Sequence, residues 1–396
     1  MNQLFISEIY IRKVRHLENI RITTKGDTLT HIILTGKNGS GKTSVLLELK
    51  GLLFNYLKTV MSSLKAVDES RINYLTLDYF LDSHKDQPGV TFKFNELYNS
   101  SLFAAKCISN NGAITAFFPA HRVFGSSSVE AIKPLSKIKS SALSSGIENP
   151  MRKQFVDYMI SLDYIRLSSI EENDSSTAKS ASDWFNNFES ILRKIYDCNE
   201  LTLRKSKEEM DYYIAIPGRE PFNFNQLSDG YGSVLDIIAE IMMRYDFASI
   251  PYDSPGIIII DEIETHMHVK LQKDILPILT QLFPNAQFIL STHSPFVLSS
   301  VKNSVVYDLE SKTEVTDMSL YSYQGIVEHY FGENNYTHGA TEALNRYIYL
   351  SEYSSLSDAE KQEMSELANS FLSIPDDAAS ELKSAFLDYE LRRRMR

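Results

Sequence analysis

Apolar and polar positions along this chain follow strand and helix periods in alternating blocks. Near the N-terminus, the runs LFISEIYI, ENIRITT and THIIL alternate apolar and polar residues, which predicts an antiparallel β unit across residues 4–34. Two near-continuous apolar runs, GIIIID (256–261) and AQFILSTH (286–293), are typical of buried parallel strands, and a helical pattern separates them. We therefore predict an α/β fold with a mostly parallel core sheet flanked by helices and an antiparallel β subdomain.

Helical spacing dominates the middle of the chain. Residues 150–198 have apolar side chains at helical intervals, and the polar segment EENDSSTAKSASD divides them into two expected helices. The preceding residues 125–146 are rich in serine and predict a mobile loop or hinge. The sequence has neither sustained heptads nor repeats, so this helical insertion is expected to lack a long coiled coil. Other patterns predict strands at 90–98, 102–109, 113–120, 211–216 and 304–309, a hairpin turn at 110–112, helices at 44–81 and from Ser228, and a helical segment from about Ser322 onward.

The segment GKNGSGKT, residues 36–43, carries the strongest chemical signal. It fits the pattern G-x-x-x-x-G-K-[ST], in which backbone N–H groups approach phosphates, the lysine reaches the β- and γ-phosphates and the hydroxyl contacts Mg²⁺. A β-branched apolar strand precedes it and a helical pattern follows it, as this loop requires. We therefore expect ATP and Mg²⁺ as cofactors, with nucleotide contacts from Gly36, Asn38, Gly39, Ser40, Gly41, Lys42, Thr43 and Ser44.

An acidic pair follows the isoleucine-rich strand. Asp261 is expected to complete the Mg²⁺ site that Thr43 begins, and Glu262 to act as the catalytic base that polarises the attacking water. A solvated turn would show a similar acidic pair. The P-loop upstream is what favours the catalytic interpretation.

Two further motifs suit phosphate contacts. LSDGYGS, residues 227–233, begins a helix where Ser228, Gly230 and the helix N-terminus would form an anion site, although an ordinary N-capped helix has the same pattern. STHSP, residues 291–295, ends the second apolar strand, where His293 would hydrogen-bond a γ-phosphate unless it is a structural histidine. All four motifs in this order favour the nucleotide site more strongly than any one of them does.

Composition narrows the class of protein. The 396 residues are 43% hydrophobic and 23% charged, which suits a globular protein of two or three domains. The sequence shows no membrane-length apolar run and no signal-peptide pattern, and Cys107 and Cys198 lack metal spacing, so we expect a cytoplasmic protein. The net charge of −11 argues against nonspecific nucleic-acid binding. The basic run at residues 391–396 suits a solvated helix end, with partner or nucleic-acid contact as the alternative.

Together these motifs resemble those of the soluble RecF/SMC-like group of ABC-type ATPases, and they are most similar to small bacterial AAA-family ATPases of phage-defence loci such as Septu, retron-associated and PARIS systems. GKNGSGKT resembles the Walker A motif, LSDGYGS the signature, IIIIDEIETHMH the Walker B motif with its D-loop, and LSTHSPF the switch-histidine strand. The resemblance covers about residues 1–310. It implies an ABC-type P-loop NTPase head and a head-to-tail homodimer, or a higher oligomer, that holds two ATP molecules between P-loop and partner signature.

The match to the group is incomplete at two places. FFPAHR, residues 117–122, lies where the group has its Q-loop-like segment, but the family glutamine is not evident, so the resemblance implies nucleotide contact only through Arg122 or His121. Val269 stands where relatives usually have proline after the two histidines. Those histidines, His266 and His268, suit a helix start in the family pattern better than a metal site.

We expect four segments. Residues 1–125 would form the N-terminal lobe with Walker A and the β subdomain, and residues 126–205 the loop and helical insertion. Residues 206–310 would form the C-terminal lobe with signature, Walker B and switch histidine, and residues 311–396 a helical region available for partner docking.

The resemblance implies that ATP closes the dimer and hydrolysis opens it, so that the switch controls a separate effector, a nuclease or toxin, in anti-phage defence. A RecF-like DNA-repair ATPase acting on duplex DNA is the alternative, and a membrane-transporter subunit is disfavoured because the β subdomain and the THSP strand resemble the soluble group. OLD-type relatives carry a TOPRIM nuclease domain, but residues 333–347 have too few carboxylates to replace one. We therefore predict ATPase activity without an intrinsic nuclease.

Overall fold

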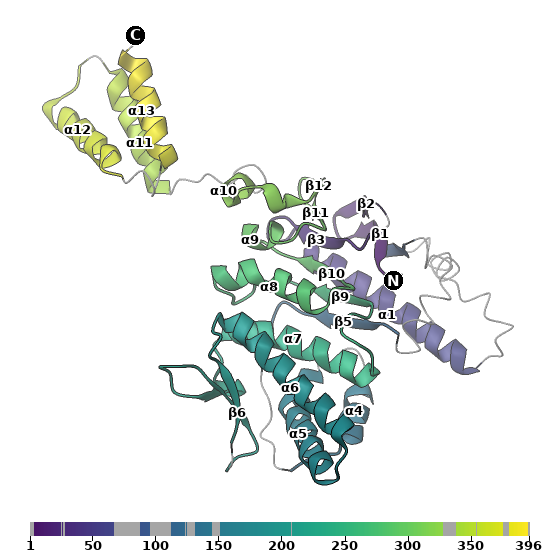
Figure 1. Ribbon diagram of the computed structural model, residues 1–396. Coiled ribbons are helices and arrows are strands. Elements are labelled where there is room, and N and C mark those ends of the chain that lie inside the picture. The colour runs from purple at the N-terminus through teal and green to yellow at the C-terminus, as the bar shows by residue number, and fades with distance from the viewer. Residues whose placement is uncertain are drawn as a thin grey trace. The chain divides into compact units, whose positions relative to one another are not determined.

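Figure 1 shows the computed structural model, which describes residues 4–24, 26, 28–66, 88–95, 112–122, 124, 131–144, 151–206, 208–327, 338–353, 355–374 and 380–394. The chain divides into two compact units, Met1–Tyr321 and Ser322–Arg396. The expected strand at 102–109, Cys107 and most of the expected hairpin turn lie outside the described residues.

Six strands form the core sheet of the first unit, in the order β12-β11-β3-β10-β9-β5 (Figure 1). Neighbouring strands are parallel except for the antiparallel edge pair β11–β12. Every residue of β3, β9, β10 and β11 is buried, which explains their continuous apolar sequences. The predicted α/β class with a mostly parallel core sheet is confirmed. The strands are β3 (His31–Thr35), β5 (Ile114–Phe118), β9 (Gly256–Ile260), β10 (Ala286–Ser291), β11 (Ser304–Asp308) and β12 (Thr313–Thr316).

A second, antiparallel sheet has the order β2-β1-β4, from β1 (Ile6–Val14), β2 (Leu17–Thr23) and β4 (Gly89–Phe94). Helix α1 (Lys42–Ala66) packs between the two sheets. Its apolar positions Val45, Leu49 and Leu53 are buried in one cluster with β1 and β9 side chains. The antiparallel subdomain is therefore confirmed, and its core is continuous with that of the parallel sheet.

Gln287 of β10 joins the two sheets by hydrogen bonds inside this core. Its Oε1 accepts from the Ile6 N–H at 2.8 Å, and its Nε2 donates to the carbonyl oxygens of Ile6 at 2.9 Å and Thr30 at 2.8 Å. The side chain is fully buried, so these backbone groups have no access to water. One glutamine thus satisfies three buried backbone groups at the junction.

Helices and a small sheet make up the rest of the first unit. The serine-rich stretch predicted to be a loop contains helix α4, in which Ile138 is buried, so that prediction is wrong over these residues. The expected break between the two long helices shrinks to residues 172–174, because Asp174 caps α6 by accepting from the Thr177 N–H. The elements are α4 (Leu135–Ser144), η3 (Met151–Gln154), α5 (Phe155–Glu171), α6 (Ser175–Tyr196), the sheet β6 (Thr202–Lys205), β7 (Tyr212–Ala215) and β8 (Phe222–Asn223), η4 (Phe224–Gln226), α7 (Asp229–Ala248), α8 (Val269–Leu282), α9 (Pro295–Leu298) and η5 (Met318–Leu320).

The second unit is helical, as the sequence predicts from about Ser322 onward. It contains α10 (Tyr323–Gly325), α11 (His338–Glu352), α12 (Asp358–Leu372) and α13 (Ser380–Arg394), and its small core centres on Tyr347, Phe371, Leu382 and Phe386. Among the helices described in both units, none combines the length and the apolar character that a membrane span needs. The four-segment division of the chain stays a prediction.

We expect Gln287→Leu to lower the free energy of unfolding by about 2–4 kcal/mol, because a side chain of similar size leaves three buried backbone groups unpaired. Urea denaturation measures the loss. The matched control is Gln281→Leu, since Gln281 lies exposed on α8, and its effect should stay within about 0.5 kcal/mol. Equal effects of the two substitutions would contradict the role of Gln287.

Candidate nucleotide-binding site

The candidate site lies where three parallel strands end. Strand β10 pairs in parallel with both β3 and β9, so the carboxyl ends of all three strands share one edge of the core sheet. The P-loop follows β3, the acidic pair follows β9 and His293 follows β10. Ligands of open α/β sheets bind at this edge.

Positive φ angles shape the P-loop backbone. Gly36, Gly39 and Gly41 have φ values of 129°, 86° and 99°, which side chains rarely allow. A Cβ atom at Gly36 would lie 2.9 Å from the Ser40 Oγ. Asn38 and Thr43 are exposed and Ser44 is half-buried, so the loop presents polar groups outward. Helix α1 begins at Lys42, which directs its N-terminal N–H groups toward the loop.

Lys42 is buried, with 5% of its surface exposed, and its charge is held inside the loop. Its Nζ donates to the carbonyl oxygens of Gly36 at 2.8 Å and Lys37 at 3.1 Å. Burial lowers the pKa of Lys42, and the nearby carboxylates of Glu262, Asp261, Glu264 and Asp308 oppose that shift. A buried cation surrounded by carbonyl oxygens at a helix start suits recognition of phosphate.

A single carboxylate oxygen of Asp261 accepts hydrogen bonds from two hydroxyl groups. Its Oδ1 accepts from the Thr43 Oγ1 at 3.2 Å and from the Ser291 Oγ at 2.6 Å, and the residue is 2% exposed. Hydroxyl and carboxylate oxygens are the ligands that Mg²⁺ prefers, usually alongside waters and substrate phosphates. The described residues contain no cluster of three His, Cys, Asp or Glu that could hold a metal alone. This donor set fits Mg²⁺ bound together with phosphates.

Glu262 adopts a backbone conformation that is unusual outside glycine, with φ of 43°. Hydrogen bonds hold the peptide groups on both sides: its N–H donates to the Ser291 Oγ at 2.8 Å, and its carbonyl oxygen accepts from the Thr265 Oγ1 at 2.9 Å and from Arg122 at 2.8 Å. Such strain persists where the surroundings determine the conformation, and it is frequent at functional sites.

One imidazole nitrogen of His293 has no hydrogen-bond partner among the described residues. Its main-chain N–H donates to Glu264 Oε1 at 2.5 Å, whereas its buried Nε2 has no hydrogen-bond partner among the described residues. Burial lowers the pKa of His293, and the Lys42 charge lowers it further. The lowered pKa favours the neutral imidazole, which in the tautomer protonated at Nε2 can donate one hydrogen bond.

The signature turn contacts the loop that follows β9. Ser228 caps α7 from an exposed position without a side-chain hydrogen bond to the helix. A Cβ atom at Gly230 would lie 2.8 Å from the carbonyl oxygen of His266, so only glycine allows this approach. Within the described residues, neither Ser228 nor Gly230 hydrogen-bonds to the P-loop. The structure therefore brings together the P-loop, Asp261, Glu262 and His293, but not the signature turn.

Arg122 differs from its predicted place as a nucleotide ligand. Its guanidinium, which is 2% exposed, makes five hydrogen bonds to the protein, one for each N–H. No donor is left for a phosphate. The family resemblance placed Arg122 near the site, but the side chain binds backbone carbonyls instead. His121 lies 6.5 Å from His266, ring to ring.

Sequence reasoning missed three residues of the site. Ser291 bridges Asp261 and Glu262, Glu264 holds the backbone of His293, and Asp308 at the end of β11 faces Gly36. The sequence points to these residues only by their positions, because each lies at the end of a strand or within two residues of the acidic pair.

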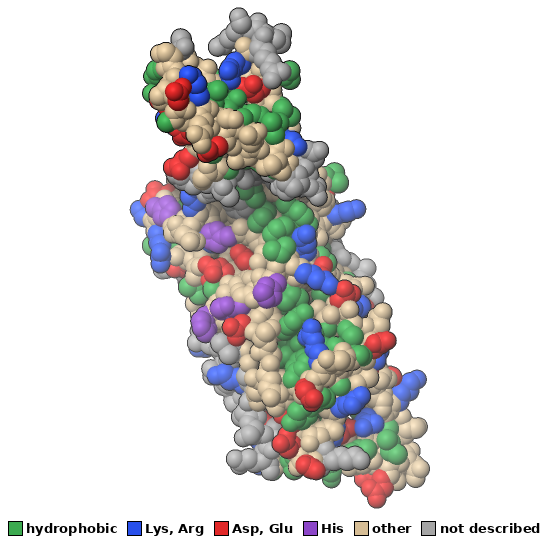
Figure 2. Space-filling model, turned by 90° about the vertical axis from the view of Figure 1, so that its left-hand side faces the viewer, with side chains coloured by type: hydrophobic (Ala, Val, Ile, Leu, Met, Phe, Trp, Pro, Cys, Tyr) green, Lys and Arg blue, Asp and Glu red, His purple; other side chains and the backbone are tan. Residues whose placement is uncertain are grey.

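Charge on the surface is mixed. On the face drawn in Figure 2, Lys and Arg side chains of the described residues are scattered among acidic and apolar ones and do not join into one continuous basic area. Histidine and acidic side chains lie near one another on this face. The described residues on this face do not form the basic stripe that is typical of duplex-DNA binding.

Residues 121–299 match a family described as AAA domain, putative AbiEii toxin, Type IV TA system. A probable ATPase of retron Vc95 from Vibrio cholerae serotype O1 biovar El Tor is 34% identical over 30% of this chain and 23% of its own length. A probable ATPase of retron Ec83 from Escherichia coli is 30% identical over 35% of this chain and 30% of its own length. The Septu protein PtuA of Bacillus mycoides (strain KBAB4) is 23% identical over 92% of this chain and 50% of its own length.

The chain is similar in sequence to probable ATPases of retrons and to a Septu protein. The predicted resemblance to retron-associated ATPases and Septu proteins is confirmed by these matches. The matched segments span about a quarter to a half of these three relatives. An SMC head domain from Thermotoga maritima aligns with a TM-score of 0.36 at 11% identity, over 76% of this chain and 94% of the other.

We expect Lys42→Met to raise the pKa of His293, because the substitution removes the positive charge that helps to lower it. Selectively labelled histidine allows the imidazole to be titrated by NMR. Lys37→Met is the matched control, since Lys37 is exposed and pairs with Glu310, and it should leave the pKa of His293 unchanged. An unchanged value in Lys42→Met would place the ammonium away from the imidazole.

Proposed function

We propose that this chain binds ATP with Mg²⁺ and hydrolyses it to ADP and phosphate, as a homodimer or higher oligomer whose closure around ATP controls a separate effector, a nuclease or toxin, in bacterial anti-phage defence. The observation that carries the ATPase proposal is the convergence of Lys42, the Thr43–Asp261 pair, Glu262 and His293 at one sheet edge. Each of these groups suits one task in phosphoryl transfer.

The geometry supports the following roles. The P-loop N–H groups and Lys42 would bind the phosphates, and Thr43 and Asp261 would hold Mg²⁺, which when bound would neutralise charge that develops on phosphate oxygens. Glu262 orients a water and accepts its proton as the water oxygen bonds to the γ-phosphorus and the bond to the β–γ bridging oxygen breaks. The neutral His293 donates its Nε2–H to a γ-phosphate oxygen.

The proposal of a dimer rests on the signature turn. Ser228 is exposed at the start of a 20-residue helix, where backbone N–H groups favour an anion, yet among the described residues neither Ser228 nor Gly230 makes a hydrogen bond to the chain's own P-loop. A second copy would supply the P-loop that faces it. The defence role and the effector rest on the relatives, which belong to retron and Septu systems.

Lys42→Ala should lower kcat for ATP by about 100-fold or more, because it removes a preorganised cation from the phosphate site. Glu262→Gln should abolish turnover but retain ATP, since the amide cannot accept the proton, and it should accumulate an ATP-dependent dimer. A phosphate-release assay measures turnover, and light scattering measures formation of the dimer.

In the Glu262→Gln background, Ser228→Arg should prevent the dimer by blocking the anion site.

Wild-type turnover in Lys42→Ala would overturn the ATPase proposal. A dimer that forms equally well with Ser228→Arg would overturn only the role of the signature turn. The two failures are therefore distinguishable.

Tagged Glu262→Gln protein, expressed with its native gene neighbourhood, should retain a stoichiometric nuclease or toxin subunit, because ATP holds the closed state that the effector recognises. Mass spectrometry of nuclease-treated complexes identifies the subunit, and Lys42→Ala is the control that should retain less of it. Recovery of the protein alone, with duplex DNA that salt releases from untreated samples, would instead support the RecF-like DNA-repair alternative.

A further inference from the structure

Arg122 joins three parts of the first unit that are far apart in the sequence. It follows β5, and its Nη1 donates to the carbonyl oxygens of Pro119 at 2.8 Å and Asp261 at 2.7 Å. Its Nη2 donates to the carbonyl oxygens of Glu262 at 2.8 Å and Ile263 at 3.0 Å. Three consecutive carbonyl groups of the loop after β9 are therefore fixed by one side chain.

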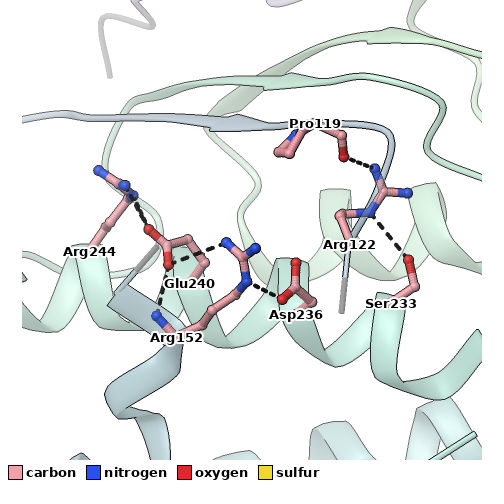
Figure 3. A network of polar contacts seen from close by, with 7 residues as sticks. All are labelled: Pro119, Arg122, Arg152, Ser233, Asp236, Glu240 and Arg244. Atoms are coloured by element: carbon pink, nitrogen blue, oxygen red, sulfur yellow. Dashed lines mark hydrogen bonds and ion pairs between the residues drawn. The ribbon is translucent and has the colours of Figure 1, made fainter. Parts of the chain in front are cut away.

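The remaining guanidinium N–H connects this loop to α7. The Arg122 Nε donates to the Ser233 Oγ at 3.2 Å, as Figure 3 shows. Ser233 lies five residues beyond Ser228, less than two turns from the start of α7. The helix that begins at the signature turn is thus one side chain away from the backbone of the proposed catalytic base.

Ser233 is one of four buried polar residues on a single face of α7. Ser233, Asp236, Glu240 and Arg244 are spaced three or four residues apart, and each is at most 9% exposed. Arg152 of η3 forms an ion pair with Asp236, and its main-chain N–H donates to Glu240 at 2.9 Å (Figure 3). These contacts anchor α7 to the helical insertion, and they make its placement specific.

Nearby carboxylates offset part of the cost of burying the Arg122 guanidinium. Burial lowers the pKa of Arg122 to about 10, while the carboxylates of Asp236, Glu264 and Asp261 favour its charged form. The side chain is therefore a cation at pH 7. A buried cation that donates to several carbonyl oxygens restrains the backbone more strongly than neutral hydrogen bonds would.

We infer that Arg122 is a positioning residue for ATP hydrolysis: it holds Glu262 in its left-handed backbone conformation and makes that conformation depend on the placement of α7. The inference rests on the proposed ATPase function. When the signature turn binds a partner's nucleotide, the start of α7 is restrained, and the Ser233–Arg122 contact passes that restraint to Glu262. Arg122 itself does not touch the nucleotide.

The test compares kcat with nucleotide affinity in Arg122→Lys. Lysine keeps the charge but cannot reach four carbonyl oxygens and one hydroxyl at once, so kcat should fall by about 10- to 100-fold. The dissociation constant of a fluorescent ATP analogue should stay within about threefold of wild type, because no phosphate contact is lost. Thermal unfolding is followed in parallel.

Arg244→Lys is the matched control. Arg244 is also a buried arginine on this network, where it contacts Glu240 and the carbonyl oxygen of Thr115, but it does not contact the loop after β9. It should lower the melting temperature about as much as Arg122→Lys while leaving kcat within about twofold of wild type. An equal loss of kcat in both variants would overturn the inference, since it would reflect general destabilisation.

Ser233→Ala tests the connection between Arg122 and α7. Alanine is favourable in a helix interior, so this variant tests the positioning role even if Arg122→Lys fails to fold. Its kcat should fall by about three- to tenfold without a change in affinity, and its effect should be smaller when Arg122 is already replaced. An unchanged kcat in Ser233→Ala would overturn the inference. So would an Arg122→Lys protein that loses affinity tenfold but keeps kcat, because that result indicates a direct nucleotide contact.

The inference and the proposed function fail in different ways. If wild-type protein shows no turnover that depends on Lys42, the ATPase proposal is wrong. If turnover is present and depends on Lys42, but Arg122→Lys retains full kcat, only the positioning role is wrong.

Discussion

Parallel pairing of β10 with β3 on one side and β9 on the other is the constraint on which the site depends. In a parallel sheet, neighbouring strands end at the same edge, so residues separated by more than two hundred positions meet without a dedicated contact surface. The hydrogen bond between Thr43 and Asp261 exists because of this pairing. The sheet can keep its edge fixed because every residue of these strands is buried.

At this sheet edge, hydrogen bonds from polar side chains fix the backbone positions of individual residues. Ser291 and Arg122 hold the backbone of the acidic pair from opposite sides of β9. Ser291 of β10 accepts from the Glu262 N–H, and Arg122, from the loop after β5, donates to the carbonyl oxygens of Asp261 and Glu262. Gln287 does similar work at the other end of β10, where it satisfies backbone groups of the antiparallel subdomain. In each case a buried backbone group would otherwise be unpaired, which costs more than an ordinary hydrogen bond contributes.

The sequence predicted the fold class and the position of the four motifs because these depend on local patterns. Runs of apolar residues indicate buried strands, and the spacing of glycines indicates the P-loop. The sequence patterns gave wrong predictions where contacts between distant residues determine the structure. Helix α4 lies in a serine-rich stretch whose Ile138 is buried by neighbouring helices, and the partners of Arg122 lie up to 141 residues away. Nothing within the segment FFPAHR distinguishes an arginine that binds phosphate from one that binds carbonyl groups.

The Lys42 ammonium has partners within the P-loop itself, since the carbonyl oxygens of Gly36 and Lys37 accept hydrogen bonds from it. Binding of an anion there is therefore an exchange of acceptors, and its net gain is the difference between two sets of hydrogen bonds. These contacts also compensate the charge of a buried cation, which would otherwise be costly.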